Sequence, residues 1–375
     1  MSAIALGSRS ASFGSLDKAV VNHYDFIDNA KAIGIVLIVL GHSKGLPEYL
    51  SHLVFGFHVP LFFFISGFLI KSNKLETSIV DNAKKVLQYA GVPYVLFFIV
   101  AYIYWLGTRS IGAKALMYVG TAWYVPVWGL FTGLVSDLYV DPPLWFFPCF
   151  ISTVIVYHAS RKLLSTTIST WLFVVLAAAI SLLWKTTSPQ LPFGLSPMLI
   201  ALAFYSLGQA ARTKNYFLSL KSAHLIFGFL IALALLAYAV SKTGLVDLAS
   251  MNFGLSPKLY LLTAMLGIFA TFSISRLLPS SRITRWLSAN TLTIFPLHFI
   301  FFSLIRGVAT SLHLIPHEYH YGLGWSLMSS IFAILLCVPA VYMLRLLRLP
   351  KESFGRMRGS TRGGKPQQGG CKYDK

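Results

Sequence analysis

A lysine and a histidine are expected on one face of the first apolar stretch of the chain. Lys31 and His42 lie eleven residues apart within residues 26–43. Eleven steps of about 100° return to nearly the same helix azimuth, so the two side chains should lie three turns apart on one face. Twelve residues separate Lys31 from Lys44. They give about 18 Å of helix against a hydrocarbon core of about 30 Å.

Asp28 and Lys31 are therefore expected at or inside membrane depth. Ionisable side chains there are costly and usually line a cavity. The alternative is that Lys31 extends its aliphatic stem and reaches the membrane surface with its ammonium group.

Two more histidines lie in apolar stretches, His58 within 55–67 and His298 within 290–298. A short turn joins the first two stretches, so His42 and His58 are expected as neighbours at similar depth. Pro60 is expected to kink the second helix next to His58. Near neutral pH, histidine is the natural base for taking a proton from a hydroxyl. The alternative, open for each of the three, is a hydrogen-bonding role between membrane helices.

Composition places these residues in a membrane protein. Of 375 residues, 56% are hydrophobic and 11% are charged, whereas a soluble protein has about 25% charged residues. The net charge of +19 suggests nucleic-acid binding, but basic loops that face the cytoplasm explain it better. Three cysteines far apart predict neither a disulfide framework nor a metal site.

The pattern predicts an all-α, polytopic membrane protein with about ten transmembrane helices around a central cavity. After the first helix, nine uncharged runs are long enough to cross: 51–70, 88–107, 142–160, 163–184, 186–211, 225–241, 259–275, 286–305 and 321–344. Residues 115–136 are an eleventh candidate, but their Trp, Tyr, Gly and Pro content suits an interfacial or re-entrant segment.

Charge decides the topology. With ten spans and both termini in the cytoplasm, 24 of the 31 Lys and Arg residues lie inside and 7 outside; a crossing at 115–136 would leave 11 inside and 20 outside. The positive-inside rule favours the first arrangement. We predict a cytoplasmic segment at 1–25, a membrane domain at 26–347 and a basic, disordered cytoplasmic tail at 348–375.

Four segments carry a family resemblance. Residues 27–42 resemble the first helix, and residues 57–67 the second helix, of the acyltransferase family 3 membrane proteins. The Pro-Leu-Trp-Phe segment at 143–146 and the segment 290–298 resemble two later motifs, in the same order. The Gly-His ending and the His-Val-Pro-Leu-Phe-Phe block are closest to the branch of fucose 4-O-acetylases and exopolysaccharide acetyltransferases.

The resemblance implies transfer of an acyl group, usually acetyl from acetyl-CoA, to a sugar hydroxyl of an exported or surface polysaccharide or its lipid-linked precursor. His42 matches the family's histidine, and His58 is the second catalytic candidate. The family typically carries an Arg before this His; here the place is Lys31, which keeps the charge and loses the bidentate fork. Lys31 and Asp28 are the residues expected to serve acetyl-CoA.

The acceptor side and the reaction route leave alternatives open. His298, Trp145 and Ser66 are candidates for acceptor contacts or for structural roles. In the direct route, His42 takes the proton of the sugar hydroxyl, which attacks the thioester. In the two-step route, a histidine is acetylated first. His58, or a Tyr or Trp donor, is expected to stabilise the oxyanion. Membrane lipids are the remaining expected partner.

Two readings from other classes compete with the enzyme. A secondary transporter of a sugar or small anion would also fit ten spans, but it should show broken helices in matching halves and a carboxylate at mid-depth. A non-catalytic scaffold of a polysaccharide-exporting assembly would tolerate the loss of His42.

Overall fold

The computed structural model describes residues 24–70, 77–164, 166–184, 187–315 and 321–346. Helices are the only extended secondary-structure elements among these residues, and their one β-bridge joins Asp247 and Asn252. The all-α prediction is therefore confirmed for this part of the chain. The N-terminal segment before residue 24 and the tail from residue 347 lie outside the described residues.

The helices follow the apolar stretches of the sequence closely. The longer elements are α1 (Asp25–His42), α2 (Glu48–Phe55), α3 (His58–Phe68), α4 (Ile79–Val86), α5 (Val92–Thr108), α8 (Phe146–Leu163), α9 (Thr167–Leu183), α10 (Leu195–Thr213), α12 (Ser222–Thr243), α13 (Pro257–Leu277), α14 (Arg282–Ala289), α15 (Thr291–Ser311) and α16 (Leu323–Leu346). The shorter elements are η2 (Leu87–Gly91), α6 (Ala113–Met117), α7 (Val127–Thr132), η3 (Pro142–Trp145) and α11 (Tyr216–Ser219).

Seven helical stretches among the described residues are long and apolar enough to cross a membrane: Glu48–Phe68, Ile79–Thr108, Pro142–Leu163, Ser222–Thr243, Pro257–Leu277, Thr291–Ser311 and Leu323–Leu346. The count of about ten is not confirmed. The other three predicted spans are helices, namely α1, α9 and α10. α1 carries Asp25, Asp28 and Lys31 in its first two turns, and α9 has only 17 residues.

Residues 115–136 do not form one continuous helix. They contain the end of α6, which has five residues, and α7, which has six. At about 1.5 Å per residue, neither helix is long enough to cross a hydrocarbon core. The structure therefore agrees with the prediction that residues 115–136 do not cross the membrane.

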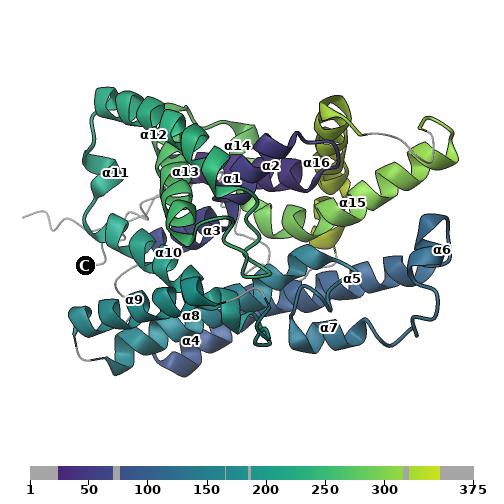
Figure 1. Ribbon diagram of the computed structural model, residues 1–375, viewed down its shortest axis with the longest axis horizontal. Coiled ribbons are helices and arrows are strands. Elements are labelled where there is room, and N and C mark those ends of the chain that lie inside the picture. The colour runs from purple at the N-terminus through teal and green to yellow at the C-terminus, as the bar shows by residue number, and fades with distance from the viewer. Residues whose placement is uncertain (1–23, 71–76, 165, 185–186, 316–320, 347–375) are drawn as a thin grey trace, which may run out of the picture.

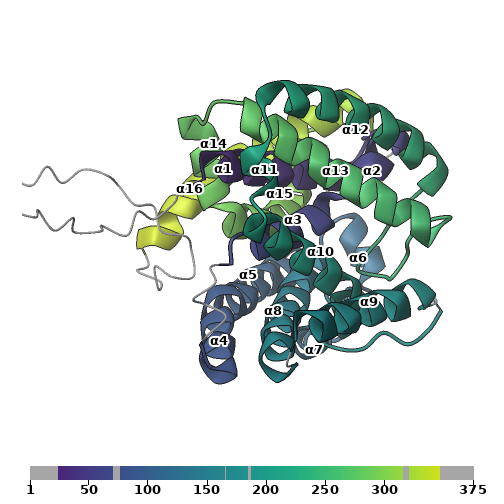
Figure 2. The same cartoon turned by 90° about the vertical axis from the view of Figure 1, so that its left-hand side faces the viewer.

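α1 is the central helix of the bundle. It packs against α2, α3, α13, α14, α15 and α16. Figure 1 shows it enclosed by these helices, while α12 runs along one edge and α4, α8 and α9 form the opposite edge. The view turned by 90° shows the same arrangement, with α5, α8 and α9 gathered on one side of α1 and α3 (Figure 2).

Glycines allow the inner helices to approach closely. A methyl group on Gly67 of α3 would overlap the backbone of Tyr205, and one on Gly208 of α10 would overlap the backbone of Phe64. Small residues at such crossings let helix backbones touch, which is the usual means of packing membrane helices. This contact fixes α3, the helix that carries His58.

The first turns of α1 are tied to their neighbours by buried polar contacts. The Asn29 amide donates to the carbonyls of Ser275 and Leu278, at 3.1 and 2.9 Å, and so holds the end of α13. The Ser288 hydroxyl of α14 donates to Asp28 at 2.6 Å. The N-terminal end of α1 is therefore anchored on two sides.

Candidate active site

Three histidine rings meet at the C-terminal end of α1. The ring centroid of His42 lies 5.1 Å from that of His298 and 6.1 Å from that of His58. His58 and His298 are buried, whereas His42 is half-buried. The predicted proximity of His42 and His58 is confirmed, and the structure adds His298 from α15 to the same cluster.

Backbone contacts set the tautomer of all three rings. In each case Nδ1 lies within hydrogen-bond distance of the carbonyl oxygen four residues earlier. These carbonyls belong to Ile38, Val54 and Ile294, at 2.9, 2.8 and 3.3 Å. A carbonyl only accepts, so Nδ1 must donate, and the neutral ring then has a lone pair on Nε2. Each histidine thus presents a basic nitrogen on the side away from its own helix backbone.

Local sequence brings His42 and His58 together. Gly34 and Gly41, seven residues apart on α1, let the next helices approach. A methyl group on Gly34 would lie 2.9 Å from the Phe62 ring, and one on Gly41 would lie 2.8 Å from Val54. The second helix is interrupted between α2 and α3, directly before His58. The kink expected next to His58 is therefore confirmed.

His42 is the member of the histidine cluster that lines a cavity of about 390 Å³. The cavity lies where α1, α5 and α15 end and α16 begins. Its lining is mainly aromatic, aliphatic and basic. The lining residues are His42, Lys44, Tyr104, Trp105, Lys114, Met117, Tyr118, Tyr139, Val140, Phe299, Ile300, Phe302, Ser303, Arg306, Trp325 and Ser329.

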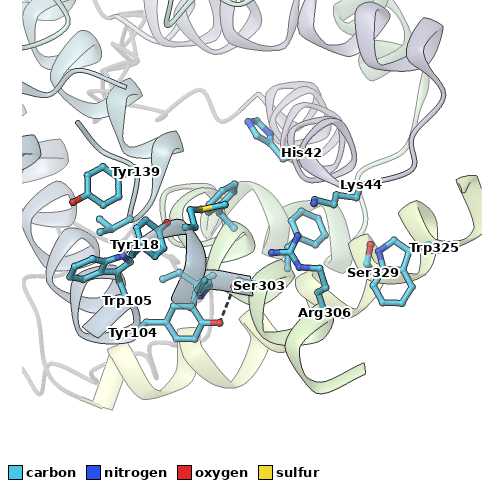
Figure 3. A pocket seen from close by; sticks show the side chains of 16 residues that line it. His42, Lys44, Tyr104, Trp105, Tyr118, Tyr139, Ser303, Arg306, Trp325 and Ser329 are labelled. Carbon is cyan, nitrogen blue, oxygen red and sulfur yellow. Dashed lines mark hydrogen bonds between the residues drawn. The ribbon is translucent and has the colours of Figure 1, made fainter. Parts of the chain in front are cut away.

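Three of the aromatic side chains and two of the basic ones lie on different walls of this cavity. Figure 3 shows Trp105, Tyr118 and Tyr139 together on one side, with Lys44 and Arg306 on the other. The Tyr118 ring lies 5.7 Å from Tyr139 and 5.5 Å from Trp105. The Tyr139 hydroxyl is buried and has no hydrogen-bond partner among the described residues. A bound molecule would therefore meet ring faces on one wall and positive charge on the other.

The basic wall is electrostatically strained. Loss of hydration lowers the pKa of Lys44 and of Lys114, and the positive charge of Arg306 lowers both further. The Lys114 ammonium donates to the Thr108 hydroxyl at 2.9 Å and lies 4.5 Å from the centroid of the Tyr104 ring. These neutral partners position the charge without cancelling it.

Comparison with known families identifies the chain. The model of an acyltransferase domain, that of acyltransferase family 3, matches residues 24–344. The chain belongs to acyltransferase family 3. Comparisons with curated proteins and with solved structures gave no match.

Family membership makes this chain a membrane acyltransferase and decides against the transporter reading. The match covers the histidine cluster and every residue that lines the cavity. The family match identifies neither the acyl donor nor the acceptor. It also does not assign the chain to the branch of fucose 4-O-acetylases and exopolysaccharide acetyltransferases.

The other predicted site residues of this acyltransferase lie away from the cavity. Lys31 is half-buried, and α1 is unbroken from Asp25 to His42, so Lys31 and His42 do share one helix face. Asp28 bonds to Ser288, as described above. The Ser66 hydroxyl donates to the carbonyl of Phe62 in its own helix, at 2.7 Å, and Trp145 is half-buried in η3.

Sequence reasoning missed most of the residues that line the cavity. It named Trp145 as a candidate for acceptor contacts, whereas Tyr139 and Val140, a few residues earlier, line the cavity. The useful signal was the set of seven basic residues that the predicted topology places outside. Lys44, Lys114 and Arg306 are three of those seven, and all three line the cavity.

Proposed function

We propose that this acyltransferase transfers an acetyl group from acetyl-CoA to a sugar hydroxyl of an exported or surface polysaccharide or of its lipid-linked precursor. The family supplies the reaction class. The aromatic wall of the cavity suits the apolar face of a sugar ring. The closest sequence resemblance, to the branch of fucose 4-O-acetylases and exopolysaccharide acetyltransferases, supports a glycan acceptor.

One observation supports the proposal more than any other. His42 lines the cavity, and its Nδ1 donates to the carbonyl of Ile38. The Nε2 lone pair is thereby left to accept a proton from a molecule in the cavity. A general base needs both this nitrogen and access to the acceptor, and His42 has them.

The proposed chemistry is direct transfer. The sugar oxygen attacks the thioester carbonyl carbon while His42 Nε2 takes the hydroxyl proton. The tetrahedral intermediate collapses, the carbon–sulfur bond breaks, and the proton passes from His42 to the departing CoA sulfur. The products are an O-acetyl sugar and CoA with a free thiol, and His42 returns to its neutral form.

The oxyanion of the intermediate needs a proton donor, which narrows the candidates. In the tautomer described above, the Nε2 atoms of His58 and His298 carry no proton. The Tyr139 hydroxyl and the Trp105 indole N–H each carry one, line the cavity and are buried without a partner among the described residues. We assign the oxyanion to Tyr139, and Trp105 is the alternative donor. His58 and His298 become positioning residues for His42, because their ring centroids lie 6.1 and 5.1 Å from that of His42.

The donor is assigned to the opposite end of α1. CoA is polyanionic and cytoplasmic, and Lys31 lies eleven residues, about 16 Å of helix rise, from His42. Asp28 lies one turn before Lys31 and acts on it electrostatically. In this proposal Lys31 binds a CoA phosphate as a point charge.

The proposed location is a bacterial inner membrane, with ten crossings and both termini in the cytoplasm. Cysteines introduced near Lys242 should react with a membrane-impermeant thiol reagent in whole cells. Cysteines near Arg212 and Arg282 should react only after lysis. The opposite pattern at Arg212 and Arg282 would contradict the ten-crossing topology.

The function is tested on the intact protein, purified in detergent and supplied with radiolabelled acetyl-CoA. In cells that contain the chain, O-acetyl groups should be present on the exopolysaccharide, and they should be absent when the chain is deleted. The purified protein should release CoA only when a glycan acceptor is present. An unchanged polysaccharide in the deleted strain would contradict the glycan acceptor, and labelling of the protein at a histidine would favour the two-step route.

A further inference from the structure

Three basic side chains from distant parts of the chain line the cavity beside His42. Lys44 lies in the turn after α1, Lys114 in α6 and Arg306 in α15. None of the described side chains that line the cavity is acidic. Figure 3 shows Lys44 and Arg306 extending toward the same space. Positive charge therefore accumulates there without a carboxylate in the lining to balance it.

Gathering these cations costs free energy in the empty protein. Burial lowers the pKa of Lys44 and of Lys114, and repulsion from the positive charge of Arg306 lowers both pKa values further. Their observed partners are neutral: the Tyr321 ring centroid lies 5.5 Å from the Lys44 ammonium, and the Lys114 ammonium meets Thr108 and Tyr104. An anionic group would relieve the repulsion, and a neutral one would not.

The predicted topology makes this clustering unusual. It leaves seven of 31 basic residues outside, and three of the seven line one cavity. A fourth, Arg109, lies 4.6 Å from the ring centroid of Trp105, which forms the facing wall. Basic residues on that side are otherwise disfavoured, so their concentration at the proposed catalytic histidine calls for a ligand.

We propose that the acceptor is anionic and carries a carboxylate or phosphate group that Lys44, Lys114 and Arg306 bind while its hydroxyl reaches His42. This inference rests on the proposed function and narrows its acceptor class. The aromatic wall then receives the sugar ring, and the basic wall receives the substituent. Arg306 can bind either group through two parallel hydrogen bonds.

The first test compares matched acceptors in the transfer assay with the purified protein. Methyl glucuronide and glucose 1-phosphate carry a carboxylate and a phosphate, and methyl glucoside is the neutral control. At least one anionic sugar should be acetylated with a kcat/KM about tenfold or more above that of the glucoside. The preferred anion identifies the chemical group. Equal acetylation of all three would overturn this inference and leave the proposed function standing.

The second test removes the charge. Arg306→Gln should raise KM for the preferred anionic acceptor about tenfold and leave KM for acetyl-CoA unchanged, and Arg306→Lys should recover part of the loss. Lys258→Gln removes an exposed cationic side chain of α13 that does not line the cavity, and it should behave as wild type. A rise in KM for acetyl-CoA instead would assign the cations to the donor and overturn the inference.

Binding without turnover gives a further measurement if none of the model sugars is acetylated. The absence of acetylation would count against the sugar acceptor of the proposed function. The anion site is then tested separately, by measuring how much each ligand raises the unfolding temperature. Glucuronate or glucose 1-phosphate should raise the unfolding temperature of the wild type more than glucose does, and Arg306→Gln should abolish the difference. Equal shifts with all three sugars would overturn the inference.

Discussion

The two ends of α1 are built in opposite ways. At the N-terminal end, the Asn29 amide nitrogen donates to two carbonyls at the end of α13, and Asp28 accepts from Ser288 of α14; among the described residues only Asn29 Oδ1 of these groups has no partner. At the C-terminal end, His42 lines the cavity. There, the Tyr139 hydroxyl of the cavity wall and the Nε2 atom of His298 in the histidine cluster are buried without a hydrogen-bond partner among the described residues. One end uses its polar groups to hold helices together, and the other keeps them available.

This difference separates stability from function along one helix. A buried polar group that is fully bonded contributes to packing, whereas one left without a partner costs free energy unless a ligand satisfies it. We therefore expect substitutions at the Asn29 end to lower stability first, and substitutions at the His42 end to lower activity first.

The largest expected effect among the supporting residues is at Tyr139. Tyr139→Phe removes one hydroxyl from the cavity wall and leaves the ring packed against Tyr118. Removing one oxyanion donor typically lowers kcat about 10²–10³-fold, so a loss of that order is expected with an unchanged unfolding temperature. Steady-state kinetics and thermal unfolding of the purified protein check it. Tyr124→Phe, on an exposed side chain outside the cavity, is the matched control.

Asn29 should show the reverse pattern. Asn29→Ala removes both hydrogen bonds to the end of α13 and should lower the free energy of unfolding by about 2 kcal/mol. The folded fraction should keep its kcat. Gln209→Ala, which removes an exposed amide contact with Thr213, should change the free energy of unfolding by less than about 0.5 kcal/mol. If Asn29→Ala lowered kcat at unchanged stability, the contrast between the two ends would be wrong.

Lys31 tests whether the anchored end also serves the donor. Lys31→Ala should raise the KM for acetyl-CoA about tenfold while the acceptor KM stays constant, since a charge-assisted contact with a phosphate is lost. Lys31→Arg should keep most of the affinity. Lys214→Ala, an exposed cation at the end of α10, controls for a general effect of positive charge. An unchanged KM in Lys31→Ala would leave Lys31 as a side chain that only reaches the membrane surface.

A further prediction concerns Asp141, next to the cavity residue Val140. Burial raises the pKa of this carboxyl well above its usual value, and neither oxygen has a partner among the described residues. The unfolded chain ionises at lower pH than the folded protein, so stability should fall as pH rises above about 4, by at most about 1.4 kcal/mol per pH unit. Asp141→Asn should remove that dependence. Unfolding temperatures at pH 5 and pH 7 give the comparison, and identical pH profiles would contradict it.

The sequence predicted the parts of the site that depend on local periodicity. The shared face of Lys31 and His42 and the meeting of His42 with His58 follow from helix geometry and a short connection. The cavity could not be predicted in this way, because Tyr104, Lys114 and Arg306 come together only through packing of α5, α6 and α15. The orientation of each histidine was equally hidden, since it depends on the carbonyls of Ile38, Val54 and Ile294.

The number of crossings also depends partly on local sequence and partly on packing between helices. Each of the ten predicted spans is helical. α1, however, holds three charged side chains near its start, and their tolerance at that depth depends on neighbours such as Ser288. Residues 115–136 look like a span by length alone. They form two short helices, and a positive φ of 74° at Gly120 and of 63° at Gly133 marks the turns around α7.

The central claim is that His42 is the base that activates the acceptor, and its removal is the most direct test. His42→Ala should lower kcat/KM for acetyl transfer by about 10²–10⁴-fold, because a positioned acid–base group is lost. Its unfolding temperature should stay near that of His224→Ala, an exposed histidine of α12. If correctly folded His42→Ala transferred acetyl groups at the rate of His224→Ala, His42 would not be the base, and the scaffold reading or a base elsewhere would replace this account.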